Sequence, residues 1–400
     1  MTGGRKDNIA DLPEPVCRYR YDLVGMAEHV GKVVAQLPER CRMFYAMKAN
    51  SAPEVLGTLA PIVAGFEVAS GGEITKARAA GADVPVVFGG PAKTPAEIAQ
   101  ALDAGVVRFH AESVLELHRI SAVAVAAGRV ADVLIRVNLA GPFPPATIAM
   151  AGGATQFGID ESRLGDAMHA AAELPGVRFA GFHLHSLSNN LSPSAHLEML
   201  TLYRDKITGW ERRFGVRCEV VNVGGGIGVN YLPPTGSASH GEVGPQFDWP
   251  SFTSELDRLV ATFPPHWAEV DFECGRFLVA PFGTYEVEVL DVKRNHGTQY
   301  VVVRGGTHHF RLPASWQHSH PFRVRAVDDW PDALPRPAAT GSAVTVVGEL
   351  CTPKDVLARD VVVDHVRAGD VLEFVHAGAY GWEISHHDFL SHPHPEHVFR

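Results

Sequence analysis

The chain has 400 residues, of which 46% are hydrophobic and 20% charged, and its formal net charge is -10. This length and composition favour a globular protein longer than one ordinary domain and argue against disorder. The negative charge argues against a general nucleic-acid or anionic-membrane surface, and no apolar run reaches the roughly 18 residues of a membrane span. We therefore expect neither nucleic-acid nor membrane partners.

Five scattered cysteines form no C-x-x-C pair, and the start "MTGGRKDNIADLPEP" lacks the apolar core of a signal peptide. These features disfavour a disulfide framework or a zinc ribbon, and they predict a cytoplasmic location. Histidine is frequent, with 21 in all, and several lie in the carboxy-terminal "SHHDFLSHPHPEHVFR". Its prolines and irregular spacing give no fixed ligand geometry, so we expect no metal site.

Eight strand-like runs alternate with helical patterns through the first two thirds of the chain. The runs are "RMFYAM", "AGFEVA", "VPVVFG", "GVVRFH", "DVLIRV", "RFAGFHL", "CEVVNV" and "EVDFE". Amphipathic or Ala-rich stretches such as "TPAEIAQALDAG" and "SAHLEMLTLYRDKITGWERRFG" lie between them. Strand and helix in steady alternation indicate parallel pairing with right-handed crossovers. Eight such units over about 240 residues predict a (β/α)8 barrel.

The pattern changes after Pro281, where alternating runs such as "TYEVEVLDV", "QYVVVRGG" and "AVTVVGEL" are separated by Gly and Pro. Alternation of this kind is typical of antiparallel strands. We therefore predict a barrel domain over residues 36–281 and a carboxy-terminal antiparallel β-barrel or sandwich domain over residues 282–400. Residues 1–35 carry no strong pattern and are assigned to an N-terminal segment that joins the β domain.

Active sites of such barrels form at the carboxyl ends of the strands, so the residues there are candidates for chemistry. "MFYAMKAN" places Lys48 at the end of the first strand. A lysine is by type a surface residue, but this position favours a desolvated lysine that faces a site. In "VNVGGGIGVNY", the glycines after the seventh strand would let backbone N–H groups approach a phosphate.

A desolvated lysine and a phosphate site in one barrel suggest pyridoxal phosphate held as a Schiff base. Glu273, in "ECGR" after the eighth strand, can pair with the ring nitrogen of this cofactor. A carboxylate there keeps the nitrogen protonated and the ring a strong electron sink, as decarboxylation requires. The alternative is that Glu273 pairs with Arg276, three residues on.

The chain resembles the fold type III pyridoxal-phosphate decarboxylases, the group of the ornithine, diaminopimelate and carboxynorspermidine enzymes. The resemblance runs from residue 44 to residue 382 in family order. It rests on "FYAMKAN", "FEVASGGE", "QFGID", "VNVGGGIGVNY", "ECGR", "GELCTPKD" and "HAGAYGW". It implies a (β/α)8 barrel that binds pyridoxal phosphate, a second β domain, and a homodimer with shared active sites.

The resemblance also implies roles for single residues. Lys48 would hold the aldehyde carbon of the cofactor, His185 would stack on its ring, and Glu273 would pair with its nitrogen. Cys351 of the partner subunit would protonate the carbanion, and Asp355 would line the pocket for the distal end of the substrate. The phosphate would be held by a further set: Ser188, Gly225, Gly226, Arg276 and Tyr380.

Two positions depart from the family pattern. Leu187 replaces a glycine next to Ser188, which weakens the phosphate assignment there. Thr352 stands where the basic-amino-acid decarboxylases have a carboxylate, and a bare ammonium needs such a fixed negative charge. Arg311, with His309, His318 and His320 nearby, favours an anionic substrate. The carboxy-terminal tail resembles that of a branch of these decarboxylases found in the assembly of carboxylate-type siderophores, which act on citryl-diaminopropionate and similar adducts.

Alternatives remain from this reading of the sequence. Within enzymes, the substrate could be a diamino acid or a carboxylated polyamine of the diaminopimelate, ornithine or carboxynorspermidine type. From another class, the chain could be a non-catalytic carrier of pyridoxal phosphate, although Cys351 and Tyr380 speak against it. A metal-binding accessory protein that uses the histidine-rich tail is the third possibility.

Overall fold

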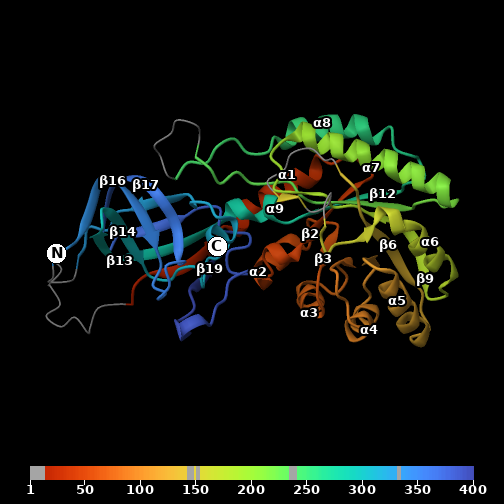
Figure 1. Ribbon diagram of the computed structural model, residues 1–400, viewed down its shortest axis with the longest axis horizontal. Helices are drawn as coiled ribbons and strands as arrows, with labels where there is room; N and C mark the ends of the chain where they lie inside the picture. Colours follow the sequence, from red (N-terminus) through yellow and green to blue (C-terminus); the bar gives the residue numbers. More distant parts are fainter. Residues whose placement is uncertain (1–13, 142–147, 150–153, 234–240, 331–334) are drawn as a thin grey trace. The chain divides into compact units, whose positions relative to one another are not determined.

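The computed structural model describes residues 14–141, 148–149, 154–233, 241–330 and 335–400 (Figure 1). The chain divides into two compact units. One unit comprises residues 25–229 and 246–278. The other comprises residues 1–24, 230–245 and 279–400.

The first unit is a closed barrel of eight parallel strands, which confirms the predicted fold. The strands follow one another in the order β5-β4-β3-β2-β12-β11-β9-β6, and pairing of β5 with β6 closes the barrel. All eight expected strands are present: β2 Cys41–Ala46, β3 Gly65–Val68, β4 Val86–Phe88, β5 Arg108–Ala111, β6 Ala131–Asn138, β9 Val177–His183, β11 Val220–Gly224 and β12 Glu269–Cys274. Short pairs are added by β8 Ile159–Asp160, and by β7 Ile148–Ala149 with β10 Leu187–Ser188.

Helices alternate with these strands, and α7 and α8 run side by side (Figure 1). The helices are α1 Leu23–Ala35, α2 Pro53–Leu59, α3 Gly71–Ala80, α4 Pro95–Asp103, α5 Val114–Ala126, α6 Leu164–Glu173, α7 Pro193–Phe214, α8 Trp249–Val260 and α9 Arg276–Val279. Side-chain caps fix several starts; Thr94 and Glu97, for example, form a reciprocal capping box on α4.

Helix α1 lies where the sequence showed no strong pattern. Its buried residues are Met26, Val30 and Val33. Their spacing of four and three residues is that of one helical face, although two glycines weaken the helix propensity of the segment. The helical signal was therefore present but faint.

Strand alternation decides which side chains face the inside of the barrel. Phe182 packs against Trp210 of α7, and Phe272 meets Phe252 of α8, with ring centroids 5.0 Å and 6.4 Å apart. These phenylalanines therefore face the helices, and because successive strand residues point to opposite faces, the residue after each one faces inward. Four strands carry this pair of a phenylalanine followed by an ionisable residue: Phe66-Glu67, Phe109-His110, Phe182-His183 and Phe272-Glu273.

The second unit is built on an eight-stranded sheet. Its strands run in the order β15-β18-β13-β14-β16-β17, and β1 joins β13 to β19. The bounds are β1 Cys17–Tyr21, β13 Gly283–Asn295, β14 Thr298–Val303, β15 Phe322–Arg325, β16 Ala338–Val347, β17 Val356–Arg367, β18 Val371–Phe374 and β19 Glu396–Phe399, with a short helix α10 Leu312–Trp316.

The sheet of the second unit is mixed and not purely antiparallel as expected. Strand β14 pairs in parallel with β16, and β1 pairs in parallel with β19. Between β14 and β16 the chain passes through α10 and β15 before it returns, and a connection of this length allows parallel neighbours. Alternation of apolar and polar residues along a strand shows which face of the strand is buried. It does not show whether the neighbouring strand runs parallel or antiparallel.

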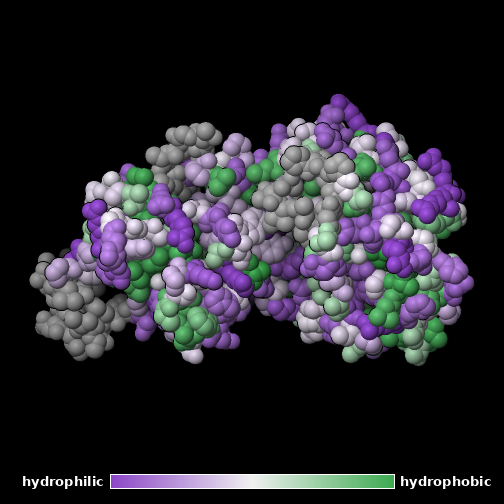
Figure 2. Space-filling model, in the orientation of Figure 1, coloured by the Kyte–Doolittle hydropathy of each residue, from purple (hydrophilic) through white to green (hydrophobic). Residues whose placement is uncertain are grey.

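The surface of each unit mixes hydrophilic and apolar side chains on the face shown in Figure 2. Large exposed apolar residues such as Val24, Leu115, Val130 and Leu232 lie on separate segments, as is usual at a protein surface. Among the helices that the structure describes, none is both long enough and apolar enough to cross a membrane.

Candidate active site

Lys48 lies just beyond the carboxyl end of β2, in a single 3-10 turn over Met47–Ala49. Its Nζ donates a hydrogen bond to Glu67 Oε2 at 2.6 Å, and Glu67 is buried at the end of β3. The Lys48 side chain is 48% exposed, so the desolvation expected from the sequence is wrong. The adjacent carboxylate holds the amine at the rim, where a bound molecule can reach it.

Glu67 has an environment that the sequence analysis did not recognise. Burial raises the pKa of this carboxyl above its ordinary value, and the Lys48 ammonium acts in the opposite direction. The pair is therefore an amine and a carboxyl that can exchange a proton at one end of the barrel. The signal in the sequence was Glu67 itself, a charged residue inside the apolar run "AGFEVA".

Glu273 faces the interior of the barrel near the end of β12. Its Oε1 accepts a hydrogen bond from Asn222 Nδ2 at 2.7 Å, and its two oxygens lie 3.4 Å from His110 Nδ1 and 3.3 Å from His183 Nε2. This cage of polar neighbours favours a site carboxylate over the simple Glu273–Arg276 pair. Arg276 is buried at the start of α9.

His185 is oriented by the glycine loop that follows β11. Its Nδ1 accepts a hydrogen bond from the Gly225 N–H at 3.0 Å. A Cβ on Gly224, which has a φ of +69°, would overlap His185 Nδ1, so a glycine is required for this close approach. Burial, together with the charges of Arg136 and Lys48, lowers the pKa of His185 well below its ordinary value, and the ring is neutral.

The hydrogen bond to His185 changes the interpretation of Gly225. The sequence assigned Gly225 to the phosphate, but its single N–H already serves the imidazole. We propose that Gly225 positions His185, and that the phosphate assignment stays with Gly226 and with Ser188 of β10. Gly226, with a φ of +90°, lies so close to the Leu187 carbonyl that a Cβ would overlap it.

The other predicted site residues lie in the second unit. Cys351 is a free, exposed thiol, and Tyr380 is half-buried with a φ of +56°. Asp355 is buried: its Oδ1 accepts hydrogen bonds from the N–H and Oγ1 of Thr307, at 2.6 Å and 2.8 Å, and its Oδ2 accepts one from the Leu350 N–H at 2.9 Å. We therefore propose that Asp355 is a scaffold for the segment that carries Cys351, and not a substrate contact.

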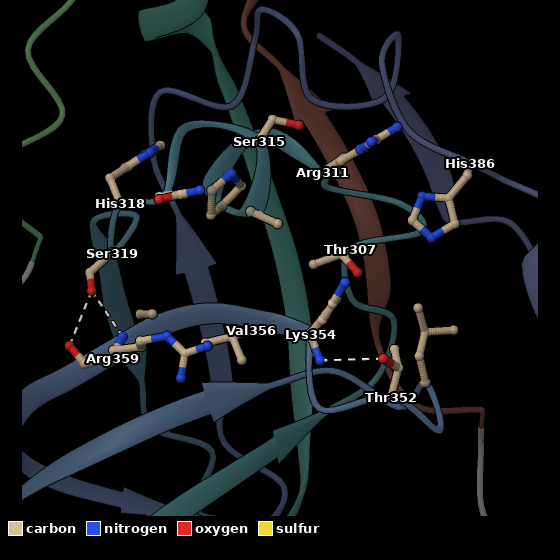
Figure 3. Close-up of a pocket in the computed structure, with 15 residues that line it drawn as sticks. Thr307, Arg311, Ser315, His318, Ser319, Thr352, Lys354, Val356, Arg359 and His386 are labelled. Atoms are coloured by element: carbon tan, nitrogen blue, oxygen red, sulfur yellow. Dashed lines mark hydrogen bonds between the residues drawn. The ribbon is translucent and has the colours of Figure 1, made fainter.

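A basic pocket of about 780 Å³ lies within the second unit (Figure 3). Arg311, Lys354 and Arg359 line it with Thr352, and none of its described lining residues is acidic. Of the expected histidines, His318 lines the pocket, together with His386, which the sequence did not single out.

His309 and His320 are buried and do not belong to the residues that line the basic pocket. Burial and the neighbouring His308 lower the pKa of His309 to about 2, so this imidazole carries no charge for an anion. The charge of the basic pocket therefore comes from its arginines and its lysine.

Sequence reasoning missed His110 and His183 because single histidines in apolar strands are more often core residues than site residues. The pairing of each with a preceding phenylalanine was the available signal. The residues of the barrel fit pyridoxal phosphate: an accessible amine at Lys48, a caged carboxylate at Glu273, and a glycine loop that side chains would fill. This set defines a barrel enzyme that combines a lysine with an electron-withdrawing cofactor.

Comparison with known proteins agrees with this class. Residues 23–280 match the family described as pyridoxal-dependent decarboxylase, pyridoxal binding domain. The 2-[(L-alanin-3-ylcarbamoyl)methyl]-2-hydroxybutanedioate decarboxylase of Staphylococcus aureus is 46% identical over 385 residues, which cover 96% of this chain and 94% of that protein. The L-glutamyl-[BtrI acyl-carrier protein] decarboxylase of Niallia circulans is 31% identical over 391 residues, covering 96% and 88%.

Among solved structures, diaminopimelate decarboxylase from Helicobacter pylori complexed with L-lysine matches with a TM-score of 0.80 at 25% identity, covering 98% of this chain and 92% of that one. The chain belongs to the family of pyridoxal-dependent decarboxylases. It is an enzyme, and pyridoxal phosphate is its cofactor.

Proposed function

We propose that the enzyme decarboxylates an amino-acid substrate rich in carboxylates, of the citryl-diaminopropionate type used in siderophore biosynthesis. The observation that carries this proposal is the 46% identity, over almost the whole of both chains, to the Staphylococcus aureus enzyme. The name of that enzyme describes a hydroxybutanedioate joined through an amide to the side chain of alanine. Such a molecule has an amino acid at one end and two further carboxylates at the other.

The barrel residues support the reaction in a defined way. Pyridoxal phosphate, when bound, supplies an electron sink for the electron pair that remains as carbon dioxide leaves. Lys48 binds the cofactor, and the Glu67 carboxyl beside it can accept or return the proton of the Lys48 amine. Glu273 would hold a proton on the ring nitrogen of the cofactor, and the neutral His185 would orient its ring. The Cys351 thiol would hold the proton that the reacting carbon takes up after carbon dioxide leaves.

The basic pocket supports the substrate class. Arg311, Lys354 and Arg359 bring positive charge to one concave surface, and an arginine binds a carboxylate through paired hydrogen bonds. Thr352, which replaces the family carboxylate, also lines this pocket and leaves it without a fixed negative charge near the cysteine. We propose that the distal carboxylates of the substrate bind here.

A citryl-diaminopropionate substrate is expected to be turned over far better than ornithine, lysine or diaminopimelate. Arg311→Ala should raise the KM for the citryl substrate about ten- to a hundredfold. This ratio corresponds to about 1.5–3 kcal/mol of binding free energy, the value of one hydrogen bond to a charged group. Product analysis by mass spectrometry and initial rates of carbon dioxide release measure both effects. Arg258→Ala, on an exposed face of α8, is the matched control.

Efficient decarboxylation of a plain diamino acid, with no activity on the citryl adduct, would overturn the substrate class. The diaminopimelate decarboxylase of Bacteroides thetaiotaomicron is 28% identical over 94% of this chain, so diaminopimelate is the competing substrate in this panel. In that case the Arg311→Ala effect should be lost as well.

We also propose a cytoplasmic homodimer in which Cys351 of the partner subunit completes the site around Lys48. Inactive Lys48→Ala and inactive Cys351→Ala subunits, mixed under conditions that exchange subunits, should then recover part of the activity. One of the two sites in each mixed dimer would contain both wild-type residues. Mass measurement of the mixed dimer shows whether subunits have exchanged. If they have and no activity is recovered, both residues act within one chain.

A further inference from the structure

Two buried histidines approach the Glu273 carboxylate from different strands of the barrel. His110, near the end of β5, places Nδ1 3.4 Å from Oε1, and His183, at the end of β9, places Nε2 3.3 Å from Oε2. The two imidazole rings lie 4.3 Å apart, centroid to centroid. Each oxygen of the carboxylate therefore faces one imidazole at a distance slightly longer than a hydrogen bond, and the nitrogens of both buried rings have no other hydrogen-bond partner among the described residues.

Both imidazoles are neutral. Burial lowers the pKa of His110 and that of His183 well below the ordinary value. The charge of Lys93 acts in the same direction on both rings, and Arg136 adds to the effect on His183. A neutral imidazole has one N–H, so each ring can donate a hydrogen bond to the carboxylate without bringing a charge.

The backbone around His110 is held firmly. Lys93 Nζ donates to the carbonyl oxygen of His110 at 2.7 Å and pairs with Glu116 Oε1 at 2.7 Å, and both charged groups are buried. A Cβ on Gly89 would lie 3.0 Å from Glu67 Oε1, a tight contact, but 3.6 Å from His110 Nδ1, an ordinary one, so this glycine leaves room mainly for Glu67. The backbone that carries the imidazole is therefore fixed by the buried Lys93–Glu116 pair.

A metal ion is the competing explanation for this cluster. His110, His183 and Glu273 are the one group among the described residues whose ligand atoms could hold an ion, and these atoms lie within 4.8 Å of one another. However, the positive charges of Lys93 and Arg108 act on His110, and they would oppose a divalent cation. Asn222 also donates a hydrogen bond to Glu273 Oε1, which makes that oxygen a weaker ligand for an ion. The surroundings thus favour hydrogen bonding between neutral groups and a carboxylate.

We propose that His110 is a positioning residue that acts through Glu273. The inference rests on the proposed role of Glu273 at the ring nitrogen of the cofactor. Asn222 donates a hydrogen bond to Oε1 at 2.7 Å, and the unpartnered Nδ1 of His110 lies 3.4 Å from the same oxygen, so the two groups together limit the plane of the carboxylate. Asn222 stabilises the ionised form through its hydrogen bond, and His110 would add to this effect once a small rotation of its ring lets Nδ1–H donate to the same oxygen.

A double-mutant cycle tests this coupling in the holoenzyme. His110→Phe is expected to lower kcat about ten- to a hundredfold, as for loss of a hydrogen bond to a charged group. In a Glu273→Gln background the same change should have little further effect. The pH at which the visible absorption of the bound cofactor changes should shift in each single variant, and no further in the double variant.

His110→Asn retains an N–H on a smaller side chain and should recover part of the lost rate, which separates positioning from packing. His169→Phe, an exposed histidine on α6, is the matched control and should leave both rate and spectrum unchanged. If His110→Phe does not fold, the double-mutant cycle can be measured with His110→Asn instead, for which a smaller loss of kcat is expected.

Three results would overturn the proposal or its basis, and they differ from one another. Equal losses on His110→Phe in both backgrounds would assign His110 to packing alone. One metal ion per chain, lost on His110→Phe, would assign the cluster to metal binding. An unchanged rate on Glu273→Gln alone would remove the proposed role of Glu273, and that result is distinguishable from failure of the His110 coupling.

Discussion

Replacing Lys48 with alanine is expected to abolish decarboxylation while leaving the fold intact. The lysine is the proposed point of attachment for the cofactor, and covalent chemistry of this kind has no substitute among neighbouring groups. Because the side chain is half-exposed, its removal creates no buried cavity. The loss should amount to several orders of magnitude in kcat, with the fold retained although Glu67 loses its ion-pair partner.

Borohydride treatment of the wild-type holoenzyme provides the direct check on Lys48. Reduction should couple the cofactor to the peptide that contains Lys48, as read by mass spectrometry. Lys293→Ala, at an exposed position on β13, serves as the control and should retain both the label and the activity. A label found on another lysine would refute the assignment.

Glu273→Gln is expected to raise the activation free energy of decarboxylation by at least about 3 kcal/mol, and so to lower kcat by two or more orders of magnitude. This is the scale of a key electrostatic stabiliser. Glutamine keeps the shape and can still accept the hydrogen bond from Asn222, so the change removes the negative charge with little else. The cofactor should remain bound, since the phosphate and Lys48 are unaffected. Rate and cofactor content of the purified enzyme, measured together, give the answer.

Glu255→Gln, on the exposed side of α8, is the control for the charge change. If Glu273→Gln retained the wild-type rate, Glu273 would be a structural residue that stabilises the barrel interior through Asn222. Loss of the cofactor instead of the rate would indicate that the carboxylate contributes mainly to binding.

The barrel was predictable because its signal is repeated eight times. Each strand is a short apolar run followed by an amphipathic helix, so a fault in one repeat does not change the fold. Lys48 and Glu273 could be found because strand ends carry the chemistry of a barrel. The roles of His110 and Glu67 could not be identified in the same way, because a polar residue inside an apolar run gives no indication of its partner on another strand.

The second unit shows where sequence reasoning reaches its limit. Asp355 stands in a recognisable motif, but its burial depends on two contacts that the motif does not encode. Thr307 is 48 residues away in the sequence, and Leu350 reaches Asp355 through a tight turn. The parallel pairing of β14 with β16 likewise depends on the path between them. Local patterns report burial and strand content, whereas partners and directions arise from the tertiary fold.

The position of β1 has a consequence for the order of events during synthesis on the ribosome. Cys17–Tyr21 emerges among the first segments, yet its antiparallel partner lies in Gly283–Asn295 and its parallel partner in Glu396–Phe399. The barrel residues 25–229 and 246–278 are all translated before the first of these partners is complete. The nascent chain must therefore keep an unpaired, tyrosine-bearing strand out of wrong pairings while the barrel closes, and a pause after residue 278 would lengthen that period.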